Sequence, residues 1–144
     1  MLGLLALTAC TRSAPTPLPQ TGPVDVPVPS GRAAACEQLV EALPEVLGDG
    51  LARRPVTGDQ ARTAAWGDPV VTLACGTAKA DPTAEVLRLG PSDDQLLTFA
   101  VDDLGAATAY TTTGLRVPVT VTVPDTQDAT VLVPLVGLLR QTLR

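Results

Sequence analysis

The chain contains no histidine and only three aromatic residues among its 144 residues. The absence of histidine excludes Ser–His–Asp and Cys–His catalysis and His-based zinc sites. The aromatic residues are Trp66, Phe99 and Tyr110, so the core must consist mainly of Leu, Val and Ala, within the 45% of residues that are apolar. A single lysine, Lys79, and a net charge of -5 argue against nucleic-acid binding, because phosphate contacts need a basic face.

Motifs that carry catalytic chemistry are also lacking. None of the three serines lies in a G-x-S-x-G elbow, and no glycine-rich phosphate-binding motif occurs. The acidic pairs Asp93-Asp94 and Asp102-Asp103 lie outside the EF-hand pattern, and aspartate is a common turn residue. We therefore expect no enzymatic activity, no cofactor and no metal site.

The first ten residues resemble the end of a bacterial lipoprotein signal peptide. The apolar run from Leu2 to Ala9 is too short to span a bilayer, which needs about 20 residues, but it suits the apolar region of a signal peptide. The tetrapeptide that ends at Cys10 resembles a lipobox, in which the cysteine is lipidated and becomes the new N-terminus. No Lys or Arg precedes Cys10, so we expect the basic region of the signal to lie upstream of Met1. We expect residues 1–9 to be the signal peptide and Cys10 to anchor the chain on the extracytoplasmic side of the cell membrane.

Residues 10–31 are interpreted as the lipidated cysteine followed by a proline-rich stalk. Six of the 21 residues from 11 to 31 are proline, which disfavours helix and sheet and favours extended polyproline II. At about 3.1 Å per residue such a stalk could reach roughly 65 Å. We expect it to lie outside the core. A proline-rich ligand for a partner domain is the alternative.

Residues 32–144 are expected to form one domain. Apolar positions at intervals of three and four residues predict a first helix from about Arg32 to Leu47, with a kink at Pro44.

Residues 51–69 look irregular. Strands are predicted at 70–75, 96–102, 107–113 and 116–123, whereas 83–89 is ambiguous between a strand and a helical turn. Because proline cannot donate a ladder bond, Pro118 predicts an edge strand or a bulge. A final helix is predicted from a stripe of Leu132, Leu135, Val136, Leu139 and Leu143, with Pro134 in its first turn.

This order of elements predicts an α+β fold. We expect a mainly antiparallel sheet of about four strands, with an N-terminal and a C-terminal helix on one face.

Two cysteines remain for the domain. Cys36 lies on the apolar face of the first predicted helix, and Cys75 shares a strand face with Val71 and Leu73. Outside the cytoplasm thiols oxidise, so a disulfide between them is predicted if these faces meet. The bond would close a loop of 39 residues (75 minus 36). A redox pair or a zinc site is the alternative, but the first usually has Cys-x-x-Cys spacing and the second needs four ligands.

Trp66, Arg53, Arg54 and Asp68 are the candidate ligand contacts. A guanidinium could bind a carboxylate or phosphate in a fork, and the indole could stack on the same ligand. The competing interpretation is that Trp66 fills the core beneath the long loop. We favour the second, because a lone tryptophan in a chain this poor in aromatic residues is needed for packing.

Several sequence blocks resemble a known family. They read C-E-Q-L-V-E-A-L-P, R-R-P-V, A-A-W-G-D-P-V-V-T-L-A-C-G, T-T-G and V-T-V-T-V-P. Together they resemble the actinobacterial lipoproteins catalogued as domain of unknown function 3515, over roughly residues 34–143. The block from Trp66 to Gly76 is the most specific part. A further tryptophan is common in that family where Leu96 to Phe99 stand here, so no role of that residue transfers.

The resemblance implies a cell-envelope location and the paired cysteines, and it brings no established activity. We therefore expect a non-catalytic envelope lipoprotein, an adaptor or accessory protein on the outer face of the cytoplasmic membrane, with an envelope protein as partner. The alternative is a lipoprotein that binds a small ligand or peptide in a pocket near Trp66, Arg53 and Arg54.

Overall fold

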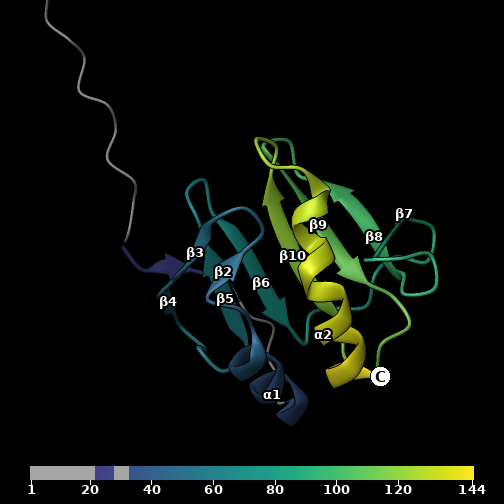
Figure 1. Cartoon of the computed structure of the whole chain (residues 1–144), viewed down its shortest axis with the longest axis horizontal. Helices are drawn as coiled ribbons and strands as arrows, with labels where there is room; N and C mark the ends of the chain where they lie inside the picture. Colours follow the sequence, from purple (N-terminus) through teal and green to yellow (C-terminus); the bar gives the residue numbers. More distant parts are fainter. Residues whose placement is uncertain (1–21, 28–32) are drawn as a thin grey trace, which may run out of the picture.

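The computed structural model describes residues 22–27 and 33–144, and its centre is an eight-stranded antiparallel sheet (Figure 1). The helices are α1 (Ala34–Ala42) and α2 (Val133–Leu143), the second preceded by the 3-10 helix η1 (Ala129–Leu132). The strands of the large sheet are β2 (Val46–Leu47), β3 (Leu51–Arg54), β5 (Thr63–Trp66), β6 (Val71–Cys75), β7 (Glu85–Leu89), β8 (Leu97–Asp103), β9 (Ala107–Thr112) and β10 (Val119–Pro124). Two further strands, β1 (Val24–Asp25) and β4 (Val56–Thr57), form a separate parallel pair.

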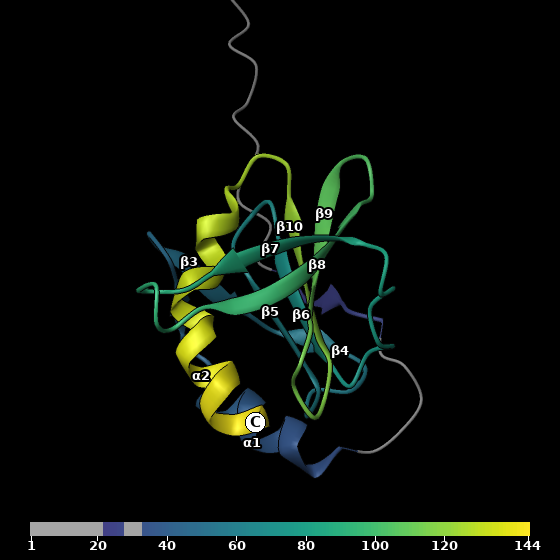
Figure 2. The same cartoon turned by 90° about the vertical axis from the view of Figure 1, so that its right-hand side faces the viewer.

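The strand order of the large sheet is β2-β3-β5-β6-β10-β9-β8-β7. After β6 the chain crosses to the far edge and returns through β7, β8 and β9, so that β10 comes to lie beside β6. The sheet is strongly twisted: in Figure 2, β7 and β8 run across the view while β9 and β10 run along it. α2 packs against this sheet and contacts α1.

The expected α+β fold with about four strands is wrong. The described part of the chain is mainly β, with eight strands in one sheet and two short helices, of which only α2 lies near a chain end. The expected N-terminal helix is also wrong, because α1 begins only at Ala34, after the β1 strand. The extra strands arise largely from residues 51–69, which were expected to be irregular. These strands have two to four residues each, which is too short to show a clear alternation of apolar and polar residues.

The first helix is shorter than the sequence predicts. It ends at Ala42, and Leu43 is already extended, with φ -64° and ψ 145°. The cause is Pro44, whose ring disfavours the helical conformation in the residue before it. The next residues form β2, which pairs with β3 as a hairpin. The turn between them contains Gly48 and Gly50, both at positive φ, which glycine adopts at no steric cost.

The alternation in β10 is confirmed, but its place in the sheet differs from the prediction. Val119, Val121 and Val123 are buried, whereas the threonines between them are partly exposed. The predicted edge position is wrong, because β10 lies between β6 and β9. Pro118 does not interrupt the ladder, since it directly precedes the strand. Its carbonyl oxygen accepts the Gly76 N–H at 2.8 Å.

The core lies between the sheet and the helices. The predicted stripe of α2 is confirmed, since all five of its residues are buried and Pro134 lies in the first turn. As the composition suggests, leucine and valine supply most of this core. The two largest fully buried side chains are nevertheless aromatic, Trp66 and Phe99.

The predicted disulfide is confirmed. Cys36 on α1 and Cys75 at the end of β6 are bonded, with their Cα atoms 5.6 Å apart, and neither side chain is exposed. The buried faces of helix and strand therefore meet as the sequence pattern suggested.

The prediction that the whole proline-rich stretch stays outside the core is wrong for residues 22–27. Val24 and Asp25 form β1, which pairs with β4, and Val26 is only 4% exposed. The predicted signal peptide, Cys10 and the other stalk residues lie outside the described residues. Within the described ranges, no helix combines the length and the apolar character needed to cross a membrane.

Candidate binding site

Trp66 belongs to the core. Its side chain is completely buried, and its indole Nε1 donates a hydrogen bond to the Pro44 carbonyl oxygen at 2.9 Å. Arg53 lies opposite Trp66 in the pairing of β3 with β5, and its guanidinium carbon is 5.3 Å from the ring centroid, a cation–π contact. The interpretation of Trp66 as a core residue is therefore confirmed, and the ring offers no exposed face to a ligand.

Arg54 binds backbone carbonyl groups from two other parts of the chain. Its Nη1 donates to the Gly67 carbonyl oxygen at 3.0 Å, and its Nη2 donates to the Gly22 carbonyl oxygen at 2.9 Å. The Nε atom of Arg54 is enclosed and has no hydrogen-bond partner among the residues that the structure describes. The guanidinium thus binds two carbonyl groups of the protein's own backbone, whereas the sequence suggested a fork on the carboxylate or phosphate of a ligand.

Gly67 and Asp68 form the turn between β5 and β6. Gly67 has a φ of 72°, and a Cβ atom added there would lie 2.7 Å from Cδ2 of Leu51. Asp68 is exposed and is joined to Pro69 by a cis peptide bond. The four predicted ligand contacts are therefore near one another, but Trp66 and Arg53 pack together and Arg54 holds two segments of backbone.

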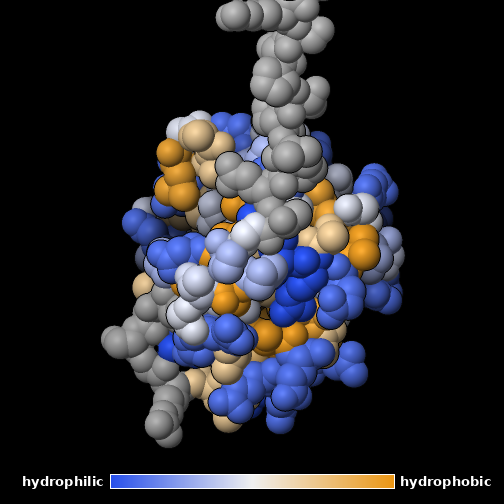
Figure 3. Space-filling view, turned by 90° about the vertical axis from the view of Figure 1, so that its left-hand side faces the viewer, coloured by the Kyte–Doolittle hydropathy of each residue, from blue (hydrophilic) through white to orange (hydrophobic). Residues whose placement is uncertain are grey.

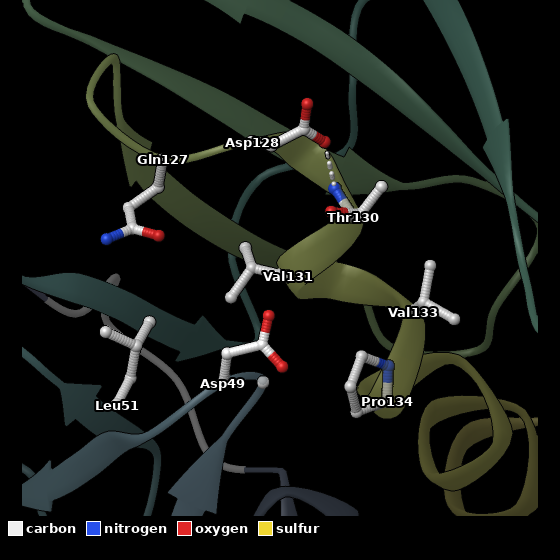
Figure 4. Close-up of a pocket in the computed structure, with 9 residues that line it drawn as sticks. Asp49, Leu51, Gln127, Asp128, Thr130, Val131, Val133 and Pro134 are labelled. Atoms are coloured by element: carbon white, nitrogen blue, oxygen red, sulfur yellow. Dashed lines mark hydrogen bonds between the residues drawn. The ribbon is translucent and has the colours of Figure 1, made fainter.

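A cleft of about 550 Å³ lies elsewhere, between the β2–β3 turn and the start of α2 (Figure 4). Asp49 and Leu51 lie on one side of it, and Val133 and Pro134 lie on the other (Figure 4). The remaining residues that line it are Gly48, Gln127, Asp128, Thr130 and Val131. With two carboxylates beside apolar side chains, the cleft suits a cationic group on an apolar stem.

One of these carboxylates has a shifted pKa. Asp128 Oδ1 accepts the Thr130 N–H at 2.8 Å and caps η1. This backbone hydrogen bond to the charged form holds the pKa of Asp128 below its usual value, so the carboxylate is ionised at neutral pH. The cleft therefore carries at least one fixed negative charge.

A second cavity, of about 580 Å³, lies under the loop that follows β6, on the sheet face away from α2. Its floor contains Ala100 and Ala109, and its edge includes Lys79, the only lysine of the chain. Three hydroxyl groups form a row in it: Thr120 Oγ1 is 2.9 Å from Thr77 Oγ1 and 2.8 Å from Thr111 Oγ1. The strand pattern predicted some of these residues as surface positions, but no local pattern reveals a hollow between a loop and a sheet.

One member of each acidic pair, Asp94 and Asp103, stabilises a turn, as expected. Asp94 accepts a hydrogen bond from the Ser92 hydroxyl at 2.6 Å, which lowers the pKa of Asp94, and Asp103 accepts the Gly105 N–H at 2.8 Å. Among the described residues no three His, Cys, Asp or Glu side chains gather in a way that could hold a metal ion.

A buried arginine was not anticipated from the sequence. Arg62 is 6% exposed, and its Nε donates to the Cys75 carbonyl oxygen at 3.2 Å. Its Nη2 donates to the carbonyl oxygens of Cys75 at 3.1 Å and Gly76 at 3.2 Å. Arg62 thus holds the end of β6, next to the disulfide. Arginine is rarely buried, and these three hydrogen bonds go to backbone carbonyl oxygens, which leave no signal in the sequence.

Comparison with known proteins gives one family. The family model described as "Protein of unknown function (DUF3515)" matches residues 1–144. The searches of curated proteins and of solved structures find no significant match.

Proposed function

The chain belongs to the DUF3515 family of proteins of unknown function, and from this premise we propose that it is a non-catalytic cell-envelope lipoprotein. In this proposal it is tethered by Cys10 to the outer face of the cytoplasmic membrane, and it acts there as an adaptor or accessory protein for an envelope protein partner. The proposal includes that the chain is an actinobacterial lipoprotein, because its sequence blocks resemble those proteins.

The observation that carries the location is the disulfide between Cys36 and Cys75. Disulfides form and persist in oxidising compartments and are rare in the cytoplasm. This one joins α1 to β6 inside the core, with both cysteines fully buried. A structural bond of this kind is expected in a domain that folds after export.

The lipobox-like sequence supplies the tether. Removal of residues 1–9 would leave Cys10 as the N-terminal residue, available for acylation. A single acyl chain binds a membrane only marginally, whereas two chains anchor a protein stably. A diacylated Cys10 would therefore hold the domain at the membrane without any spanning helix.

The sequence contains no recognised catalytic motif, and this supports the proposed binding role. The chain has no histidine, and the acidic side chains Asp94 and Asp103 are engaged in turns. The distinctive residues Trp66, Arg53 and Arg54 make structural contacts. What the described residues offer to other molecules includes their surface, cavities such as the two above, and strand edges.

The experiment is mass spectrometry of the native protein from a membrane fraction, with Cys10→Ala as the control. We expect an N-terminal diacylated Cys10, oxidised Cys36 and Cys75, and release of Cys10→Ala from the membrane. An unmodified Cys10 in the native protein, or reduced Cys36 and Cys75, would refute the proposed location.

A second candidate function is the binding of a small cationic ligand in the cleft of Figure 4. The ionised Asp128 and the apolar wall formed by Val133 and Pro134 favour it. Titration with hexylammonium tests it, using Asp49→Asn as the variant because Asp128 also caps η1. Equal affinity in the wild type and Asp49→Asn would exclude the cleft.

A further inference from the structure

Residues 22–27, named here the docking segment, lie along β4 as an extended peptide. Val24 and Asp25 pair in parallel with Val56 and Thr57, and the Val24 N–H donates to the Pro55 carbonyl oxygen at 2.9 Å. The Thr57 hydroxyl donates to Asp25 Oδ1 at 3.3 Å. Among the residues that the structure describes, β4 pairs with no other strand, so the docking segment is the strand that completes it.

Arg54 clamps the start of this segment. The Gly67 carbonyl oxygen fixes one arm of the guanidinium from inside the domain, and the other arm donates to the Gly22 carbonyl oxygen. The first contact does not involve the docking segment. Arg54 therefore keeps its orientation when the segment leaves, and it presents Nη2 as a ready donor to another carbonyl group.

Val26 supplies the apolar part of the contact. It is 4% exposed, whereas Asp25 beside it points to solvent, as alternation along an extended strand requires. Figure 3 faces the side of the molecule on which β1 lies in Figure 1, and this face shows hydrophobic residues among hydrophilic ones. The site thus recognises two features of an extended peptide: its backbone N–H and carbonyl groups, and one apolar side chain.

The contact is also small enough to open. A two-residue parallel pair is marginal without further packing, and regions with few buried groups open at low free energy. In the sequence only a few residues connect the segment to the domain, which favours its return to β4 after it opens. A short connection of this kind gives an effective concentration on the order of millimolar.

We propose that β4 and Arg54 form a strand-addition site for an extended segment of a partner protein, and that the docking segment is its internal occupant. The partner segment pairs with β4, gives a carbonyl oxygen to Arg54 Nη2 and buries a β-branched side chain where Val26 lies. In recognition of this kind, hydrogen bonds between the backbones give the affinity, and pockets for every second side chain give the specificity. The inference rests on the proposed adaptor function and names its contact surface.

The test uses the full chain, with Val26→Asp to release the docking segment and leave β4 intact. The probe is a synthetic peptide with the sequence of residues 21–28, TGPVDVPV. The control peptide has Asp at the position of Val26, and the control protein is Val86→Asp, whose valine is 58% exposed on β7. Backbone amide signals of Val56 and Thr57 report binding.

We expect saturable shifts of the Val56 and Thr57 amides in Val26→Asp. Shifts in the wild type and Val86→Asp should be at least about tenfold smaller, because the tethered segment competes at its effective concentration. Adding Arg54→Lys to Val26→Asp should weaken peptide binding by about tenfold, since a guanidinium fork is lost. These results would support the site.

Three results would overturn it. The first is the absence of shifts in a Val26→Asp protein whose thermal unfolding and Trp66 emission match the wild type. The second is equal binding of the control peptide. If Val26→Asp does not fold, Val24→Pro takes its place, since it removes the N–H donated to Pro55; the same absence of peptide binding would then be decisive. The third is a wild-type dimer lost on Val26→Asp, which would assign the site to a second copy of the chain. None of these measurements involves a membrane, so their failure leaves the proposed lipoprotein location standing.

Discussion

Cys36, on the buried face of α1, and Cys75, the last residue of β6, are joined across 39 residues of chain. The loop that they close contains β2, β3, β4, β5 and β6, and with them Trp66. The bond therefore ties α1 to the half of the sheet whose strands are shortest.

Removal of this bond should destabilise the domain by about 4 kcal/mol, because the unfolded chain gains the freedom of an open 39-residue loop. The variant is Cys36→Ala with Cys75→Ala, and urea unfolding followed by circular dichroism measures the loss. A reducing agent should lower the stability of the wild type and leave the double variant unchanged. Equal urea midpoints for wild type and double variant would show that the bond contributes nothing.

Trp66→Ala should cost about 3–5 kcal/mol, because a fully buried indole leaves a large cavity. Trp66→Phe should cost less, since it fills part of that space, although the Pro44 carbonyl oxygen loses its donor. Thermal unfolding by circular dichroism gives both values. In the wild type, Trp66 emission should be blue-shifted and poorly quenched by iodide. A red-shifted, easily quenched emission would contradict the burial.

Gly67→Ala should destabilise the protein more than Gly105→Ala. Both glycines have positive φ, which costs an alanine about 1–2 kcal/mol. Only at Gly67 would the new Cβ collide with Leu51, while at Gly105 nothing lies within 4 Å. Chemical denaturation gives the free energy of unfolding of each variant, and the difference between the two losses measures the cost of the clash with Leu51. Equal losses would mean that Leu51 moves aside freely.

Asp128 should contribute stability that acid removes. Its pKa is lowered in the folded state by the Thr130 N–H, so the contribution is present above the unfolded value of about 3.9 and is lost as the pH falls through the folded pKa. The stability difference between the wild type and Asp128→Ala should therefore shrink on acidification from about pH 5 to about pH 2. Unfolding curves across this range measure it. If the stability difference between the wild type and Asp128→Ala grew towards low pH, the pKa of Asp128 would be raised in the folded state, contrary to this prediction.

The sequence predicted those elements whose pattern is long enough to report burial. The stripe of α2 and the valine alternation of β10 span several turns or residue pairs, so each identifies a buried face without knowledge of its partner. The strands β3, β4 and β5 were missed, because two to four residues cannot establish a period. β1 was missed for another reason: the residues around it are prolines, and only its distant partner β4 makes it a strand.

Of the candidate site, the sequence predicted the role of Trp66 but not the contacts of Arg54. The scarcity of aromatic residues pointed to a core role for Trp66, and the structure bears this out. For Arg54 the sequence suggested only a possible fork on a ligand's carboxylate or phosphate. Its contact with the Gly22 carbonyl oxygen was missed, because that atom belongs to the backbone and has no counterpart in the sequence. The block from Trp66 to Gly76, the most specific part of the family resemblance, contains the buried indole, the Gly67 turn and Cys75. Its residues serve folding.

The pairing of β6 with β10 divides the sheet into two contiguous stretches of chain. Residues 46–75 build one stretch and residues 85–124 build the other. Among the described strands, only β6 and β10 pair across the boundary. Within each stretch, the strands that pair are antiparallel and close in sequence. Val119 of β10, by contrast, pairs with Cys75 of β6, which lies 44 residues earlier in the chain (119 minus 75). Formation of this central pair should limit the folding rate, because distant contacts close last. The intervening loop at residues 76–84 is then the natural place for a circular permutation: new termini there would leave every strand pair intact.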